Sequence, residues 1–284
     1  MRTDRPARPG RDDRRRPGEG RRGQELGRGP SRGGDRPVEP RPPAPAGDLL
    51  YGRNAVLEAI HGRRRSRRLL IAQGVHEDER IRSLLTEATE RGIAIERPFR
   101  AVLDERTNGA NHQGVALEAS SYPYVGLDEI AAAAGTILVL DHLQDPQNFG
   151  TLLRAAEATA TAGVVIPRDR AVAVTPAVVN ASAGAVEHLH LAQVPNLARA
   201  ADLLKDAGWW LIGLHTGPGS VGLFAADLPS PVALVVGAEG SGIGPNLRRH
   251  CDLLVALPMR GKVASLNAAT AGAVALFEIQ RRGG

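Results

Sequence analysis

The chain has 284 residues, of which 42% are hydrophobic, and this length leaves room for two ordinary domains or one large one. Its one cysteine, Cys251, excludes an internal disulfide and a cysteine-based zinc site, and it favours a cytoplasmic setting. The longest apolar runs, residues 130–140 and 268–277, are shorter than the roughly 20 residues that a membrane-spanning helix needs. Composition therefore predicts a soluble cytoplasmic protein that has no membrane partner.

Residues 1–47 carry the whole net positive charge of the chain. They hold 13 arginines against 7 acidic residues, a net charge of +6, whereas the rest has 23 basic and 24 acidic residues, a net charge of −1. Nine glycines, nine prolines and no aromatic residue leave too little apolar surface to offset the entropy of ordering. We expect a disordered tail, and two interpretations stay open: an arm that binds phosphate backbones through counterion release, or a solvated extension without function.

Residues 50–119 predict a compact α/β unit. Their patterns indicate helices over 54–60 and 77–91, and strands over 67–72, 93–96 and 114–119. We place a first domain at 48–120. The following stretch, 121–129, contains Tyr122-Pro123-Tyr124 and Gly126 and is typical of a linker.

A second α/β pattern runs through residues 130–284. Short apolar segments predict strands at 137–140, 163–166, 209–214, 232–236 and 253–257, as in a parallel sheet that is covered on both faces. Helices at 151–161, 176–183, 196–207 and 267–281 separate several of these strands. The predicted fold class is therefore α/β.

Three polar segments follow predicted strands of the second domain. They are Asn148-Phe149-Gly150 with Arg154, then Gly237-Ala238-Glu239-Gly240, and finally Leu257-Pro258-Met259 with Ser265-Leu266-Asn267. Because open parallel sheets bind ligands beyond the carboxyl ends of their strands, we expect the three segments to share one crevice. An arginine, a carboxylate, a serine and two asparagines are suited to hold and deprotonate a hydroxyl group.

Ordinary structural roles compete with this hypothesis. Asn148 is explained by capping of a helix that begins near residue 150, and Ser265 by capping of the last helix. Glu239 stands among glycines at the end of a core strand, which favours a ligand crevice over a solvated turn. The phosphate-binding patterns G-x-G-x-x-G and G-x-x-x-x-G-K-[ST] fail at Pro245 and Ile243. The histidines lack the spacing of a metal site, so we expect no metal.

Taken together, the three segments resemble the motifs of the SpoU branch of the SPOUT superfamily. These are RNA ribose 2′-O-methyltransferases that use S-adenosylmethionine. Residues 140–154 resemble the first motif, 234–242 the second and 257–268 the third. The likeness extends over about residues 49–281, because 51–56 and 112–115 resemble the small substrate-binding domain of the subgroup that methylates a guanosine of 23S ribosomal RNA.

The resemblance implies a SPOUT domain with a deep trefoil knot, an N-terminal domain like ribosomal protein L30e, and a homodimer whose active site is completed across the interface. It implies that Arg154 acts on the ribose, either as the base or by stabilising the developing alkoxide. The high reference pKa of arginine makes a neutral guanidinium rare, which favours the second role. Glu239 is expected to orient Arg154, and Asn148, Ser265 and Asn267 to hold the ribose or the donor. The implied donor contacts are His215, Thr216, Gly237, Gly240, Leu257, Met259 and Leu266.

Two other functions compete with this interpretation. A non-catalytic RNA-binding protein of the same fold would have lost donor binding, and the complete motifs argue against it. Transfer RNA or another ribosomal site is the second alternative. Enzymes of the transfer-RNA branch commonly lack the small N-terminal domain, so its presence here favours ribosomal RNA.

Overall fold

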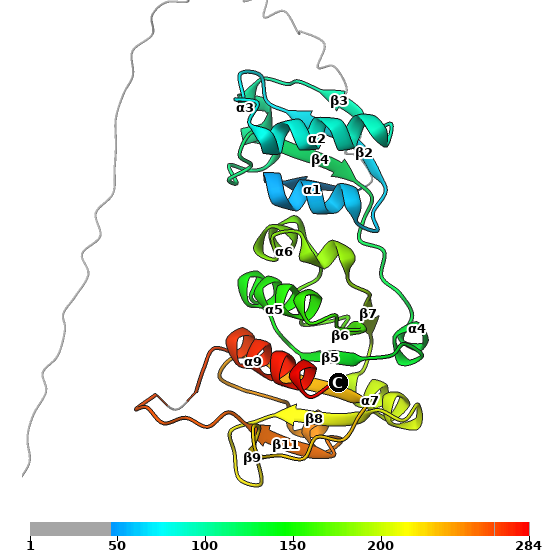
Figure 1. Cartoon of the computed structure of the whole chain (residues 1–284), viewed down its shortest axis with the longest axis vertical. Helices are drawn as coiled ribbons and strands as arrows, with labels where there is room; N and C mark the ends of the chain where they lie inside the picture. Colours follow the sequence, from blue (N-terminus) through cyan, green and yellow to red (C-terminus); the bar gives the residue numbers. More distant parts are fainter. Residues whose placement is uncertain (1–46, 264, 284) are drawn as a thin grey trace, which may run out of the picture. The chain divides into compact units, whose positions relative to one another are not determined.

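The computed structural model describes residues 47–263 and 265–283 (Figure 1), so residues 1–46 of the predicted tail lie outside the described residues. The N-terminal elements form a four-stranded sheet in the order β1-β4-β2-β3. Strand β4 is antiparallel to β1 and β2, and β3 is parallel to β2. These elements are β1 (Asp48–Tyr51), α1 (Arg53–His61), β2 (Ser66–Ile71), α2 (Glu79–Glu90), β3 (Ala94–Glu96), α3 (Arg100–Arg106) and β4 (Val115–Ala119).

The C-terminal elements form a seven-stranded sheet in the order β7-β6-β5-β10-β8-β11-β9. Every pair of neighbouring strands in it is parallel, which confirms the predicted α/β class with a parallel sheet. Its strands are β5 (Thr136–Asp141), β6 (Gly163–Pro167), β7 (Leu191–Val194), β8 (Trp210–Leu214), β9 (Val221–Gly222), β10 (Val232–Gly237) and β11 (Leu253–Ala256).

Helices cover both faces of this sheet because successive residues of a strand point to opposite sides. Leu138 and Leu234 belong to a core with residues of α5, α6 and α9, whereas Val139 and Val235 belong to a core with residues of α4, α7 and α8. The helical segments are α4 (Leu127–Ala131), α5 (Pro146–Ala158), α6 (Pro176–Ala181), the 3₁₀-helix η1 (Ala185–His188), α7 (Leu197–Asp206), α8 (Pro245–Arg248) and α9 (Ala268–Arg281).

The start of α5 and the capping residue of α9 differ from the sequence prediction. Helix α5 begins at Pro146 and not near residue 150, because the Asp145 carboxylate accepts hydrogen bonds from the backbone N–H groups of Gln147 and Asn148. Asn148 is therefore inside the helix, and its predicted capping role is wrong. Helix α9 is capped by Asn267 and not by Ser265, since Asn267 Oδ1 accepts from Ala269 N–H at 2.9 Å.

None of the helices in the described part of the chain combines the length and the apolar character that crossing a membrane requires. Among residues 47–263 and 265–283, no group of three or more histidine, cysteine, aspartate and glutamate residues is arranged to hold a metal ion.

Candidate active site

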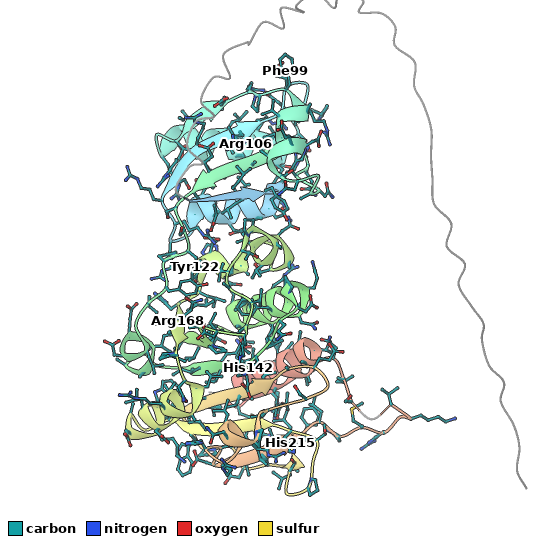
Figure 2. All side chains as sticks on the ribbon, turned by 180° about the vertical axis from the view of Figure 1, so that it is seen from behind. Phe99, Arg106, Tyr122, His142, Arg168 and His215 are labelled. Carbon is teal, nitrogen blue, oxygen red and sulfur yellow. The ribbon has the colours of Figure 1, made fainter. Side chains whose placement is uncertain are left out.

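A cavity of about 260 Å³ lies beyond the carboxyl ends of β8, β10 and β11. These strands are close neighbours in the sheet, and the loops that follow them therefore meet at one edge. Glu239, Ser265 and Asn267 line this donor cavity, as we name it here. Every residue predicted to contact a methyl donor lines it as well, namely His215 (labelled in Figure 2), Thr216, Gly237, Gly240, Leu257, Met259 and Leu266.

The glycine turn after β10 brings bare backbone to the wall of the donor cavity. Gly242 N–H donates to Ala238 O at 2.8 Å, so the chain folds back on itself. A Cβ atom on Gly237 would lie 2.0 Å from the carbonyl carbon of Gly242, which only glycine avoids. Gly240 has φ of +80°, and a Cβ atom there would meet nothing within 4 Å. The turn thus leaves open space beside its own backbone.

Three of the predicted polar residues form one hydrogen-bonded cluster. Asn148 Nδ2 donates to Glu239 Oε2 at 3.1 Å, and Asn267 Nδ2 donates to the same oxygen at 3.2 Å. Asn267 Nδ2 also lies 2.8 Å from Asn148 Oδ1, which accepts from it. The three side chains come from α5, the glycine turn and the start of α9. We call them the polar cluster.

A second cavity adjoins the donor cavity on the other side of the polar cluster. It has a volume of about 370 Å³, and Asn148, Ala238 and Glu239 contribute to its wall. Ala238 and Glu239 line both cavities, so the cluster stands where the two meet. We call this second cavity the acceptor cavity. Its other lining residues are His142, Leu143, Gln144, Asp145 and Ser241, which sequence reasoning did not single out.

Asp141 supports the glycine turn from the end of β5 and was also missed. Its carboxylate is buried, accepts from Gly244 N–H at 2.7 Å and pairs with His142 Nδ1. His142 itself has φ of +58°, a left-handed conformation that turns the chain sharply away from the strand. An acidic residue at the carboxyl end of a core strand was the available signal for this role.

Arg154 lies apart from the polar cluster within one chain. It stands in the third turn of α5, because the helix begins at Pro146. Arg154 is six positions after Asn148, which places it about 240° around the helix. The Arg154 side chain is exposed, lines neither cavity, and forms no hydrogen bond or ion pair with the described residues. Glu239 instead accepts hydrogen bonds from Asn148 and Asn267.

Comparisons with known proteins agree in both halves of the chain. Residues 135–277 match the SpoU rRNA Methylase family, and residues 49–125 match the family described as RNA 2′-O ribose methyltransferase substrate binding. An uncharacterized tRNA/rRNA methyltransferase of Synechocystis is 37% identical over 243 residues, which are 84% of this chain and 63% of that protein. The 23S rRNA (guanosine-2′-O-)-methyltransferase RlmB of Shewanella oneidensis is 38% identical over 242 residues, covering 83% of this chain and 97% of RlmB.

A solved structure extends this agreement to the fold. The SpoU methyltransferase AviRb of Streptomyces viridochromogenes, in complex with AdoMet, superposes with a TM-score of 0.69 at 26% identity. The match covers 83% of this chain and 89% of that chain. The chain therefore belongs to the SpoU rRNA methylase family and is an S-adenosylmethionine-dependent RNA methyltransferase.

Proposed function

We propose that the protein methylates the ribose 2′-oxygen of a guanosine in 23S ribosomal RNA, in the cytoplasm. The observation that carries this proposal is the position of the polar cluster between two cavities, one suited to the methyl donor and one to the acceptor nucleotide. The similarity to RlmB supports a guanosine of 23S rRNA as the acceptor. A site in transfer RNA or elsewhere in ribosomal RNA is the second candidate, and the similarity to the tRNA/rRNA methyltransferase of Synechocystis supports it.

The donor cavity fits S-adenosylmethionine in its chemistry. Leu257 and Leu266 offer apolar surface to a nucleoside ring, and the bare backbone beside Gly240 leaves room for a ligand in close approach. The carboxylate of Glu239 places negative charge beside a donor that carries a positive sulfur. When bound, S-adenosylmethionine supplies a methyl group that its sulfonium has already activated.

The chain's own part of the reaction is to orient the ribose toward the donor and to let the proton of its 2′-hydroxyl pass to water. Asn148 and Asn267 hold the Glu239 carboxylate where the two cavities meet. Ser265, which lines the donor cavity, would form a hydrogen bond with the ribose in this proposal. Arg154 supplies positive charge to the developing alkoxide in this proposal, and it does so from a second copy of the chain.

A homodimer explains why Arg154 is exposed in one chain. Helix α5 packs beside α9, and α9 exposes Val274 and Phe277, which are 36% and 51% accessible. A two-fold contact through this face would bury both apolar side chains and bring the α5 helices of the two copies together. The arginine of each copy would then lie beside the polar cluster of the other.

The N-terminal domain offers a separate surface for RNA. The two segments of the sequence that resemble a substrate-binding domain meet there, since Gln113 Oε1 accepts from Arg53 N–H at 3.1 Å. Arg53, whose guanidinium pairs with Asp78, and Arg100 line a cavity of about 490 Å³, and the described residues of its wall include no acidic one. Phe99, beside Arg100, is 69% exposed and projects from the domain (Figure 2). An exposed aromatic ring beside cationic side chains suits a stacked base and its phosphate.

Two finer features of the fold belong to the same proposal. The N-terminal domain is proposed to be L30e-like, which its small mixed sheet with three helices supports. The C-terminal domain is proposed to be knotted. Strand β11 is separated from β10 by β8, yet residues after β11 return to place Asn267 against Asn148 and α9 against α5. Such a return supports a threaded path.

The decisive experiment combines donor binding with mapping of the product. Calorimetric titration of the full chain with S-adenosylmethionine should show binding, and incubation with unmodified 23S rRNA should yield one 2′-O-methylguanosine. Binding together with methylation of transfer RNA alone would select the second candidate. No binding of the donor would contradict the enzyme and favour an RNA-binding protein of the same fold.

A further inference from the structure

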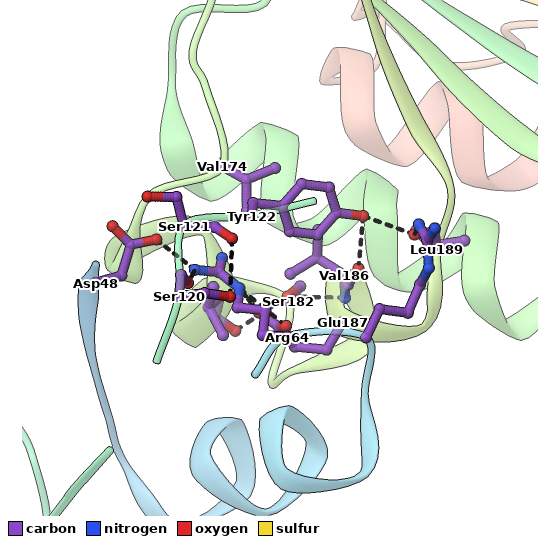
Figure 3. A network of polar contacts seen from close by, with 12 residues as sticks. Asp48, Arg64, Ser120, Ser121, Tyr122, Val174, Ser182, Val186, Glu187 and Leu189 are labelled. Atoms are coloured by element: carbon purple, nitrogen blue, oxygen red, sulfur yellow. Dashed lines mark hydrogen bonds and ion pairs between the residues drawn. The ribbon is translucent and has the colours of Figure 1, made fainter. Parts of the chain in front are cut away.

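A buried arginine joins the N-terminal domain to the catalytic domain (Figure 3). Arg64 lies between α1 and β2, and Glu187 lies in η1; both side chains are 0% exposed. Arg64 Nε donates to Glu187 Oε2 at 3.0 Å. Arg64 Nη1 pairs with Asp48 and donates to Ser120 O at 3.2 Å. One guanidinium group thus holds the first strand, the end of β4 and the catalytic domain.

Tyr122, which lies in the segment that connects the two domains, contacts residues of the same junction. Its ring centre lies 5.2 Å from the Arg64 guanidinium carbon, within the range of a cation–π contact. The Tyr122 hydroxyl donates to Leu189 O at 2.6 Å and lies 3.2 Å from Val186 O. Burial raises the pKa of Tyr122 well above its ordinary value, so the hydroxyl keeps its proton and remains a donor.

The backbones of the two domains approach closely on either side of this arginine. A Cβ atom on Gly62 would lie 2.6 Å from Glu187 Cβ, and one on Gly184 would lie 2.4 Å from Glu58 Cβ. Arg63 N–H donates to Glu187 O at 3.2 Å, which adds a direct backbone link. Such contacts bring the two domains together on both sides of the Arg64–Glu187 pair.

The junction leads directly to the helix that carries the catalytic side chains. Helix α5 packs against α6 and η1, and a Cβ atom on Gly150 would lie 2.5 Å from Ala181 Cβ. The segment from α6 to η1 is therefore a rigid layer between the N-terminal domain and α5. Since α5 bears Asn148 and Arg154, the orientation of the N-terminal domain is fixed relative to the polar cluster.

We propose that Arg64 is a positioning residue for RNA methylation, a role that rests on the proposed function. By pairing with Glu187 it sets one orientation of the RNA-binding domain relative to α5, and hence selects which ribose of the bound RNA reaches the acceptor cavity. Arg64 itself touches neither RNA nor donor. Any other orientation would leave a buried charge without its partner, which is costly.

The details of the pair favour orientation over stability as its role. The buried Nη2 atom of Arg64 has no hydrogen-bond partner among the described residues. A buried pair that is incompletely satisfied is weak evidence for stabilisation, and apolar residues of similar volume often replace such pairs without loss. A double substitution can therefore serve as the test, because it removes both buried charges, and the remaining partner of Arg64, Asp48, has a side chain that is 27% exposed to water.

The experiment compares two variants of the full chain. The first carries both Arg64→Met and Glu187→Leu, and the second is the control Arg65→Met. Arg65 is exposed and its side chain has no hydrogen bond or ion pair with the described residues. Rates are normalised to sites that bind S-adenosylmethionine, and product positions are mapped along 23S rRNA. We expect the double variant to lose roughly 10- to 100-fold in kcat on the target ribose and to methylate neighbouring riboses, with the affinity for RNA nearly unchanged.

Each result has a defined meaning. A lower kcat with a broadened set of methylated riboses supports the positioning role, because a loss of folded protein would lower donor binding without moving the sites. Wild-type kcat and a single methylated ribose in the folded double variant would overturn the role. If the unaltered chain methylates no RNA, the proposed function fails instead. Small-angle scattering then tests the junction, and an unchanged profile for the double variant would overturn the orienting role of Arg64.

Discussion

Asn267 connects helix geometry to the chemistry of the site. Its Oδ1 atom accepts from the first N–H groups of α9, which fixes the amide so that Nδ2 points to Asn148 and Glu239. Asn267 thus has two tasks, to cap α9 and to donate a hydrogen bond to Glu239. A side chain that can cap the helix but cannot donate distinguishes the two tasks.

The substitution Asn267→Asp makes that separation. Aspartate caps a helix as well as asparagine does, so the thermal stability should change little, but it cannot donate to Glu239 and adds a negative charge beside it. We expect methyl transfer to fall roughly 100-fold in a single-turnover assay. Asn196→Asp is the matched control, because Asn196 caps α7 by accepting from Arg199 N–H and lies outside both cavities. Full activity of Asn267→Asp would contradict the role of the amide.

The surface around Phe99 makes a second prediction at this scale. Phe99→Ser should weaken the binding of a 23S rRNA fragment about tenfold, because stacking of a base on an aromatic ring contributes about 1–3 kcal/mol. Donor binding in the other domain should stay unchanged. Arg80→Gln is the comparison, since Arg80 is an exposed residue of α2 that does not line the cavity. Equal affinities of the two variants for RNA would remove Phe99 from the proposed surface.

Single residues show where sequence reasoning stops. The expected donor contacts came from the resemblance to a known family, and all of them line one cavity. The orientation of Arg154 could not be predicted, because Asp145, Asn148 and Thr151 are all residue types that cap helices. The choice among them decides on which side of the helix each later side chain lies. The roles of the site residues remain predictions.

At the scale of elements, α9 is anchored at both ends. Arg281 and Arg282 donate to Glu278, and these hydrogen bonds lower the pKa of Glu278 from 4.5 to about 2. Arg282 also donates to Leu223 O at 3.0 Å and Phe224 O at 3.1 Å. The end of the helix is thereby tied to the segment after β9.

The lowered pKa predicts how stability depends on pH. A carboxyl group with a depressed pKa in the folded state contributes stability above its unfolded value of 4.5, and this contribution is lost as the pH falls toward about 2. Glu278→Gln should therefore reduce the urea midpoint at pH 6 and have a smaller effect near pH 3. Glu157→Gln on α5 is the control, because Glu157 is exposed and unpaired among the described residues. Equal pH profiles for wild type and Glu278→Gln would contradict the linkage.

Element prediction succeeded where a pattern was long or strongly apolar. The strands β5, β6, β8, β10 and β11 and the helices α2, α7 and α9 were found within a few residues of their bounds, and α5 was found with its start five residues too late. The elements β1, β7, α3 and η1 were missed, because each is short and lacks a strongly apolar run. The segment predicted as a linker contains the start of α4 for the same reason.

At the scale of the whole molecule, a dimer that shares its active sites makes a strict prediction. Arg154→Ala and Asn267→Asp should each lose methyl transfer while Arg154→Ala keeps donor binding. Mixing the two variants should restore activity to about one quarter of the wild-type value, because half of the dimers are mixed and each has one intact site. Assays after co-refolding measure this recovery. No recovery from a demonstrated mixed dimer would place Arg154 in the site of its own chain.

The tail outside the described residues yields one more prediction. Thirteen arginines in residues 1–47 suit a phosphate-binding arm, so a chain that begins at Gly47 should bind RNA with a shallower dependence on salt. The measurement is the slope of log affinity against log salt concentration. An identical slope would favour the interpretation without function.

The arrangement of segments that are remote along the chain was the property least predictable from the sequence. Hydrophobic periodicity predicts strands and their burial, but it carries no information on the order in which β10, β8 and β11 lie side by side. Nor does it reveal that Arg64 and Glu187, which are 123 positions apart, form a buried pair. Both depend on packing between segments that are remote along the chain.

The close approach of Gly62 to Glu187 bears on how such enzymes could be recombined. A chimera that grafts the N-terminal domain of a relative onto this catalytic domain would need a glycine at position 62 and an arginine two residues later. A graft without them would fold as separate halves joined by a tether. Exchange of target specificity by swapping domains is therefore restricted to relatives that already carry this glycine and this arginine.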